Sequence, residues 1–216
     1  VLKSFLQSDA QENIYVDKHK SWIEKIINWK KVFNSNSLKI NQEKGYVEPY
    51  SFFKQLSKKI NDNSLIFIDT GCSIAWAMQS MTFGKGKKVF HDFNNTAMGW
   101  ALPATIGAHF ADNEKELVCI VGDGSLMMSL QELATVMHHG LKIKLIIINN
   151  NGYSMIKQTQ EQWLNSNYVA SSNSGGISFP SYKKLSSTFH LDYFLIKNLN
   201  NDKENLNSFL INENAS

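Results

Sequence analysis

The sequence predicts an α/β fold, with an open and mostly parallel sheet that carries helices on both faces. Residues 118–121 and 144–148 are short apolar runs, and the segment between them repeats apolar residues at helical spacing. These repeated residues are Met127, Leu130, Leu133, Ala134 and Met137. A helix of roughly 14 residues travels about 21 Å and a strand of about 6 residues returns about 20 Å, so the two strands should lie parallel and end at one sheet edge.

The rest of the chain alternates between the same two kinds of element. Pro49 suits the first turn of a helix over 49–61, whose inner side should carry Phe52, Phe53, Leu56 and Ile60. Strands are predicted over 65–68, 88–93 and 193–196, and helices over 74–81, 100–108, 180–189 and from 202 onward. The polar stretch 165–178 is predicted to be an exposed loop. This order is typical of a Rossmann-like sheet.

Polar residues follow both central strands where each strand ends. Asp123 offers a carboxylate oxygen, Asn150 an amide oxygen and Gly152 a backbone carbonyl, and such hard oxygen ligands suit Mg²⁺. Gly124 and Ser125 begin a helix, whose free N–H groups favour a phosphate. The sequence therefore predicts a site for a metal ion and a diphosphate at the carboxyl edge of the sheet.

Three other interpretations of this segment remain open. Asp-Gly between apolar runs can mark a hairpin, although a long helical pattern follows it here. Gly122, Gly124 and Met127 occupy the places of a dinucleotide-binding fingerprint, but its third glycine is missing and no ribose-binding acid follows the second strand. A strand-helix-strand unit without any ligand is the third.

Composition limits the classes of function. The chain has 22 basic and 19 acidic residues, a formal balance of +3 that is too weak to predict nucleic-acid binding. No apolar run reaches the roughly 20 residues of a membrane span. Cys72 and Cys119 form no metal or disulfide pattern, and Cys119 should be a core residue. We expect a cytoplasmic protein without a membrane partner.

The motif GDGS at 122–125, followed by Asn-Asn at 149–150, resembles the cofactor-binding motif of thiamine diphosphate enzymes, in particular acetolactate synthase and pyruvate decarboxylase. The resemblance implies the thiamine diphosphate-binding fold. It also implies that Asp123, Asn150 and the Gly152 carbonyl hold Mg²⁺, which bridges the two phosphates. Gly122, Gly124 and Ser125 would then lie against the diphosphate.

Two further segments resemble parts of the same family. By that resemblance Gly71, Cys72 and Ser73, which follow the strand at 65–68, would lie beside the diphosphate, whereas an ordinary turn capped by Ser73 is the alternative. The string AMGWALPATIGA at 97–108 resembles the acetolactate synthase segment that carries a large apolar wedge under the cofactor. That wedge would be Met98, with the backbone around Thr96 bonding the aminopyrimidine. Plain core packing of Met98 is the alternative.

The segment after Gly152 resembles acetolactate synthases more than pyruvate decarboxylases. By resemblance, Tyr153 and Met155 would cover the cofactor, and Met155 matches a methionine of acetolactate synthases. Ile156 stands where pyruvate decarboxylases carry a working glutamate, which favours carboligation over simple release of an aldehyde.

The resemblance also implies that a complete active site needs a second domain. We expect residues 1–46 to be a linker or remnant of a preceding domain, and residues 47–216 to be the diphosphate-binding domain of a longer protein. The family's activating glutamate sits on a pyrimidine-binding domain of the same or a partner subunit, so no catalytic residue is assigned here and this chain alone should be inactive. The expected whole is a homo-oligomeric transferase or lyase that acts on a small 2-keto acid, with pyruvate as donor. A non-catalytic paralogue and a nicotinamide-dependent oxidoreductase are the alternatives.

Overall fold

A computed structural model describes residues 9–33, 46–84 and 86–212, and its backbone contacts divide the chain into two units, residues 1–41 and 42–216. The described part of the first unit is one helix, α2 (Asp9–Val32). Trp22 and Trp29 meet edge to face on it with ring centroids 5.5 Å apart, and both are about half exposed. The interpretation of residues 1–46 as a linker stays a prediction.

The second unit is built on four parallel strands in the order β2-β1-β3-β4. Their bounds are β1 Leu65–Ile68, β2 Lys88–Phe90, β3 Leu117–Gly122 and β4 Ile143–Ile148. Gly122 pairs with Ile148, so β3 and β4 end at the same edge of the sheet. The predicted parallel α/β sheet is confirmed, with the strand predicted over 88–93 ending three residues early.

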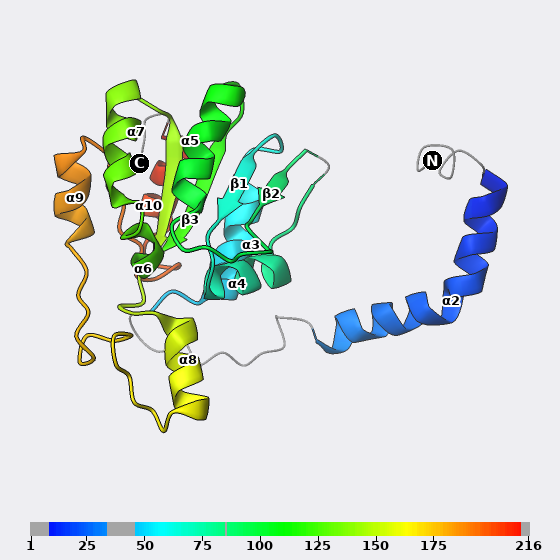
Figure 1. The fold of residues 1–216 in the computed structure, drawn as a ribbon. Coiled ribbons are helices and arrows are strands. Elements are labelled where there is room, and N and C mark those ends of the chain that lie inside the picture. Colours follow the sequence, from blue (N-terminus) through cyan, green and yellow to red (C-terminus); the bar gives the residue numbers. More distant parts are fainter. Residues whose placement is uncertain (1–8, 34–45, 85, 213–216) are drawn as a thin grey trace. The chain divides into compact units, whose positions relative to one another are not determined.

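Helices cover both faces of the sheet because β3 alternates its side chains between two cores. Val118 and Ile120 face a core that α3 (Pro49–Lys59), α4 (Cys72–Ser80) and α10 (Lys203–Ile211) complete. Cys119 and Val121 face the other core, which is completed by α5 (Ala101–Ala111), α7 (Leu133–His139) and partly buried residues of α9 (Tyr182–Thr188). Figure 1 shows α5 and α7 in front of the sheet. The inner side predicted for α3 is confirmed, since all four of its named residues are buried.

The helix predicted between the two central strands is broken into three pieces. They are α6 (Asp123–Leu126), the 3-10 turn η2 (Leu130–Glu132) and α7. Ser129 leaves helical geometry at φ −135°, which resets the phase of the helix. The buried apolar residues are consequently Leu126, Leu133 and Val136, whereas the predicted inner residues Ala134 and Met137 are exposed, Met137 by 41%.

The predicted strand over 193–196 is wrong. These residues pair with no strand, although Phe194 and Ile196 do pack against the core beside α10 while Tyr193 and Leu195 are exposed. The predicted alternation of buried and exposed side chains is therefore present. The backbone, however, makes no strand pairing, and the carbonyl of Leu195 accepts from the Asn205 side chain at 2.9 Å. The loop predicted over 165–178 contains no helix or strand beyond one isolated bridge.

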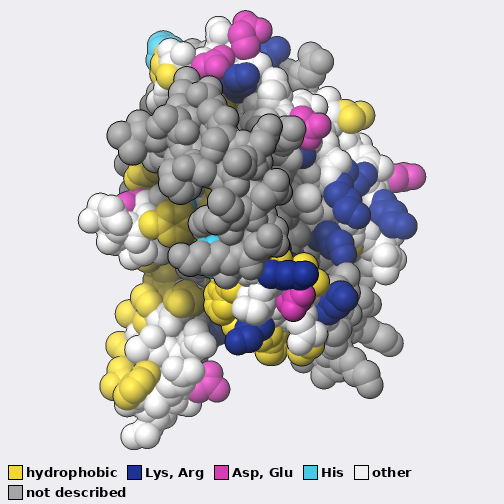
Figure 2. All heavy atoms as spheres, turned by 90° about the vertical axis from the view of Figure 1, so that its right-hand side faces the viewer, with side chains coloured by type: hydrophobic (Ala, Val, Ile, Leu, Met, Phe, Trp, Pro, Cys, Tyr) yellow, Lys and Arg dark blue, Asp and Glu magenta, His cyan; other side chains and the backbone are white. Residues whose placement is uncertain are grey.

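The surface carries both signs of charge. Figure 2 shows Lys side chains lying among acidic and hydrophobic ones on the described part of one face. None of the described helices is long and apolar enough to cross a membrane.

A buried ion pair fastens the amino ends of the strands. Lys144 of β4 lies 2.6 Å from Glu116, and the two side chains are only 12% and 11% exposed. Glu116 also accepts from the Ser64 hydroxyl and, at 2.8 Å, from the Asn61 N–H, while Lys144 donates to the carbonyl of Leu210 in α10. The pair thus ties β3 and β4 to the loop before β1 and to the last helix.

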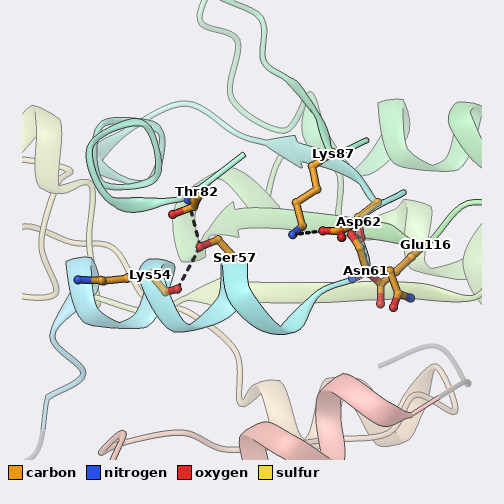
Figure 3. Close-up of polar contacts among 8 residues, drawn as sticks. Lys54, Ser57, Asn61, Asp62, Thr82, Lys87 and Glu116 are labelled. Atoms are coloured by element: carbon orange, nitrogen blue, oxygen red, sulfur yellow. Dashed lines mark hydrogen bonds and ion pairs between the residues drawn. The ribbon is translucent and has the colours of Figure 1, made fainter. Parts of the chain in front are cut away.

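A second set of contacts lies beside this pair. Figure 3 shows Asn61 next to Glu116, Lys87 directed at Asp62, and Ser57 between Lys54 and Thr82. The Asp62–Lys87 pair spans 2.9 Å, and the Ser57 hydroxyl accepts from the Thr82 N–H at 3.1 Å. These bonds join α3 to the chain that leads into β2.

Removal of the Lys144 ammonium should strongly destabilise the domain. Lys144→Ala leaves Glu116 buried without its cation, and breaking such a pair costs about 3 kcal/mol or more. Lys142→Ala removes an exposed lysine two residues away and is the control, expected to change the free energy of unfolding by less than about 0.5 kcal/mol. Equal losses for the two variants in urea unfolding would contradict a stabilising role for the pair.

The same pair makes stability depend on pH. Burial raises the pKa of Glu116, but the hydrogen bonds from Lys144 and Ser64 and the lysine charge outweigh it, so the pKa lies below the ordinary 4.5. The unfolded chain then binds this proton more readily, and the contribution is complete above pH 4.5 and lost as pH falls through the lower folded pKa. We expect Glu116→Gln to flatten the fall of unfolding free energy below pH 4.5, whereas exposed Glu114→Gln should leave the slope unchanged.

Candidate functional site

Asp123 joins the end of β3 to the loop that follows β4. Its side chain is buried, 2% exposed, at the first residue of α6. One carboxylate oxygen accepts from the N–H of Gly124 at 2.8 Å, and the other accepts from Asn150 at 3.1 Å and from Gly152 at 3.2 Å. The predicted meeting of Asp123 and Asn150, 27 positions apart, is thereby confirmed, and the contact is made by the Asn150 backbone.

The donor set around Asp123 can accommodate one cation. A carboxylate has about four acceptor directions, and backbone N–H groups occupy at least three of them, so at most one is left for a further partner. Burial raises the pKa of Asp123, although the backbone N–H bonds counteract it, so an added positive charge would stabilise the ionised form. The described residues contain no group of three or more His, Cys, Asp or Glu side chains that could hold a metal ion. A metal here would therefore need amide or carbonyl oxygens beside Asp123.

The loop after β4 packs closely against Asp123 and Ser171. Asn151 adopts φ +57°, and its neighbours Asn150 and Gly152 turn their N–H groups to one oxygen of Asp123. The side chain of Asn150 is exposed and Gly152 is buried. A Cβ on Gly152 would lie 2.6 Å from the carbonyl oxygen of Ser171, so only glycine fits there without a backbone shift.

Tyr153 covers the turn at the start of α6. A Cβ on Gly124 would lie 2.0 Å from the Tyr153 ring, so the ring packs directly on the glycine. Phe179 supports the ring edge to face, with centroids 6.2 Å apart. Gly124 and Ser125 are buried and Gly122 is partly buried. Tyr153 directly precedes α8 (Ser154–Trp163), and its predicted role in covering the cofactor stays a prediction.

Two buried polar residues that the sequence did not mark hold the following loop. Gln160 of α8 donates from its side chain to the carbonyl of Val169 at 2.9 Å and accepts from the Ser171 hydroxyl. The carbonyl of Ser171 in turn accepts from the Tyr153 N–H at 3.0 Å. Gln160 therefore anchors the loop beside Gly152, but it stands in a polar run where nothing distinguishes it.

The turn after β1 begins a helix at the same sheet edge, as Figure 1 shows for α4, α6 and α8. Gly71 has φ +110° and precedes α4 without a side-chain cap, and Ser73 is a buried residue inside that helix. The alternative of a turn capped by Ser73 is therefore wrong. Cys72 is half-buried, and burial raises the pKa of its thiol.

The segment expected to carry the wedge lies beside the same edge. Thr96 has φ +51°, Met98 is half-buried, and Gly99 has φ +79°. Asp69, which sequence reasoning did not single out, accepts from the N–H groups of Gly99 at 3.1 Å and of Ala101 at 2.8 Å. Its partners are backbone groups some thirty positions away, which leave no pattern in the side chains.

The remaining predicted residues differ in exposure. Met155 and Ile156, at the start of α8, are 49% and 44% exposed. Cys119 is fully buried as expected, and burial raises the pKa of its thiol to about 12, which removes it as a nucleophile.

Gly152→Ala tests how tightly the loop after β4 is packed. The added methyl meets a backbone oxygen, so we expect a loss of about 1–3 kcal/mol in unfolding free energy. Gly107→Ala is the control: this glycine lies in α5 with no atom within 4 Å of an added Cβ. It should stabilise the domain by about 0.5–1 kcal/mol. A Gly152→Ala protein as stable as the original would show that the loop is looser than its contacts indicate.

Comparison with known proteins identifies a family whose model covers the residues of this site. The family described as "Thiamine pyrophosphate enzyme, C-terminal TPP binding domain" matches residues 69–212. The acetolactate synthase large subunit of Cyanidium caldarium is 33% identical over 178 residues, which are 82% of this chain and 30% of that protein. That of Buchnera aphidicola from Acyrthosiphon pisum is 31% identical over 168 residues, 78% of this chain and 28% of that protein. The isozyme 1 large subunit of Escherichia coli is 31% identical over 130 residues, 60% and 23% of the two chains.

The chain thus spans about 30% of the length of the curated relatives it matches. The matched region begins at Asp69, includes Asp123 and the loop after β4, and ends in α10. This chain belongs to the thiamine pyrophosphate enzymes and carries their C-terminal cofactor-binding domain, similar to that of acetolactate synthase large subunits.

Proposed function

We propose that this chain is the diphosphate-binding part of a thiamine diphosphate- and Mg²⁺-dependent carboligase that decarboxylates a 2-keto acid, with pyruvate as the donor. The observation that carries the proposal is the Asp123 carboxylate, buried and bonded by backbone N–H groups of the loop after β4. Asp123, the Asn150 side chain and the Gly152 carbonyl would hold the metal. Family membership supports the cofactor and replaces the nicotinamide alternative.

The cofactor, when bound, supplies the carbon nucleophile that attacks the keto group of the substrate. The chain's own residues bind and orient it. Gly122, Gly124 and Ser125 offer a turn for a phosphate, Gly71 to Ser73 offer a second, and Met98 would press the cofactor rings together. Tyr153 would exclude water from the diphosphate, since its ring already covers Gly124.

The type of reaction follows from the start of α8. Ile156 has no group that could deliver a proton, and the apolar side chains of Met155 and Ile156 are partly exposed at the start of α8. An apolar surface there favours addition of the activated donor to a second carbonyl compound over protonation to an aldehyde. The names of the relatives, acetolactate synthase large subunits, support the same choice.

The complete enzyme would need more than this chain. We propose that a pyrimidine-binding domain of the same or a partner subunit supplies the activating glutamate, in a cytoplasmic homo-oligomer. Residues 1–216 by themselves would then be inactive. The chain's coverage of about 30% of its relatives is consistent with this.

Asp123→Ala in the full-length protein should abolish Mg²⁺-dependent binding of thiamine diphosphate. We expect the affinity to fall by more than about 100-fold, because loss of even an outer partner of a metal ligand costs 10- to 100-fold. Titration calorimetry with and without Mg²⁺ measures this. Asp112→Ala, an exposed aspartate that bonds only its own turn, is the control and should bind normally.

Asn150→Ala separates binding from folding, since the Asn150 side chain is exposed and its backbone bond to Asp123 survives the change. Its unfolding free energy should stay unchanged while the metal-dependent affinity falls. Normal affinity in both variants would refute the metal assignment. Binding without any turnover of 2-keto acids by the full-length protein would instead identify a non-catalytic paralogue.

A further inference from the structure

Asp69 is a buried carboxylate at the carboxyl end of β1. Its side chain is 0% exposed, and its own N–H donates to the carbonyl of Ile120 at 2.8 Å, so its backbone extends the pairing with β3. Among the described residues, no Lys or His forms an ion pair with it. A charge buried in this way is stable only if strong hydrogen bonds replace its water.

Three backbone N–H groups provide those bonds. One oxygen of Asp69 accepts from Thr70 at 2.9 Å and from Gly99 at 3.1 Å, and the other accepts from Ala101 at 2.8 Å. Ala101 is the first residue of α5, whose own cap residue Trp100 makes no side-chain bond to the helix. Asp69 therefore caps α5 from 32 positions away, and the helix dipole favours its charge.

Gly99 is held from its other side as well. A Cβ there would lie 2.7 Å from the Cβ of Met128 and 3.2 Å from the carbonyl oxygen of Ser125. Its φ of +79° is also one that residues with a side chain rarely adopt. The chain at Gly99 is thus clamped between Asp69 and the segment that follows the Asp123–Gly124 turn.

We propose that Asp69 is a positioning residue: by fixing Gly99 and Ala101 it sets the place of Met98 relative to the diphosphate turn at Asp123–Ser125. Met98 is the direct chain neighbour of Gly99, so a shift of the clamped backbone moves it at once. This rests on the proposed role of Met98 under the cofactor. Asp69 itself touches neither cofactor nor substrate and acts through the backbone that carries Met98.

The first test measures how firmly Asp69 holds the backbone of Gly99 and Ala101 when no cofactor is present. Asp69→Asn keeps the size of the side chain but replaces one acceptor oxygen with a donor. Amide hydrogen exchange at Gly99 and Ala101 in the full-length protein should then accelerate by at least about tenfold. Asp202→Asn is the matched control, because Asp202 also accepts from two backbone N–H groups, those of Lys197 and Asn198, at an exposed turn. It should affect only those two amides.

The second test measures the consequence for the cofactor. Exchange of the C2 proton of bound thiamine diphosphate for deuterium reports how well the two rings are held together. We expect Asp69→Asn to slow this exchange by about tenfold or more, since small misplacements are costly. The dissociation constant should change less than the exchange rate, because Asp123 keeps its bonds to Gly124 and to the loop after β4. A merely structural role would not separate these two quantities.

Met98→Ala distinguishes this inference from the proposed function. It should slow C2 exchange as Asp69→Asn does, while the amides of Gly99 and Ala101 stay protected. If the unaltered protein fails to bind the cofactor, the proposed function is wrong. If Met98→Ala has no effect, the role of Met98 under the cofactor is wrong, and the positioning role of Asp69 is overturned with it. If Met98→Ala slows C2 exchange but Asp69→Asn does not, the positioning role of Asp69 is overturned. Should Asp69→Asn not fold, the smaller Asp69→Ser, which admits water to both amides, is measured against the same expectations.

Discussion

The carboxylate of Asp123 is the interaction on which the candidate site depends. Three backbone N–H groups from two separate segments converge on it, and these bonds offset the cost of burying its charge. They can form only if β3 and β4 end level with each other, which the pairing of Gly122 with Ile148 ensures. The site is therefore a consequence of strand register, and the ion pair of Lys144 with Glu116 secures that register at the opposite ends of the same strands.

Asp69 repeats this arrangement one strand away. Both aspartates directly follow a parallel strand, both are buried, and both bond backbone N–H groups from distant segments. They differ in whether another possible metal ligand lies beside the carboxylate. Asp69 gives both oxygens to the start of α5 and its loop, whereas Asp123 lies at an edge where exposed Asn150 can add a further ligand. Both carboxylates thus organise the backbone, and only the one at Asp123 belongs to the proposed metal site.

Much of this fold could be predicted because its elements have local causes. β3 is a continuous apolar run since both of its faces are covered, and the meeting of Asp123 with Asn150 follows from the lengths of a helix and a strand. The break at Ser129 could not be predicted, because apolar residues recur at helical spacing on both sides of it. The false strand at 193–196 had the right alternation, but alternation does not fix where the backbone bonds, and the Leu195 carbonyl accepts from the Asn205 side chain. Asp69 escaped notice because its partners are backbone groups, and Gln160 because it stands in a polar run where nothing distinguishes it.

The candidate site contains one group of buried residues and one group of exposed residues. The groups that hold the backbone, Asp69, Asp123 and Gln160, are buried, while Asn150, Met155 and Ile156 are exposed at the same end of the sheet. Met155 and Ile156 leave nearly half of their apolar surface exposed beside the loop after β4. They suit a surface that a cofactor and a second domain would cover, which fits a chain spanning about 30% of its relatives. The domain would then supply one preformed wall of the active site, rigid because its charges are already satisfied by the backbone.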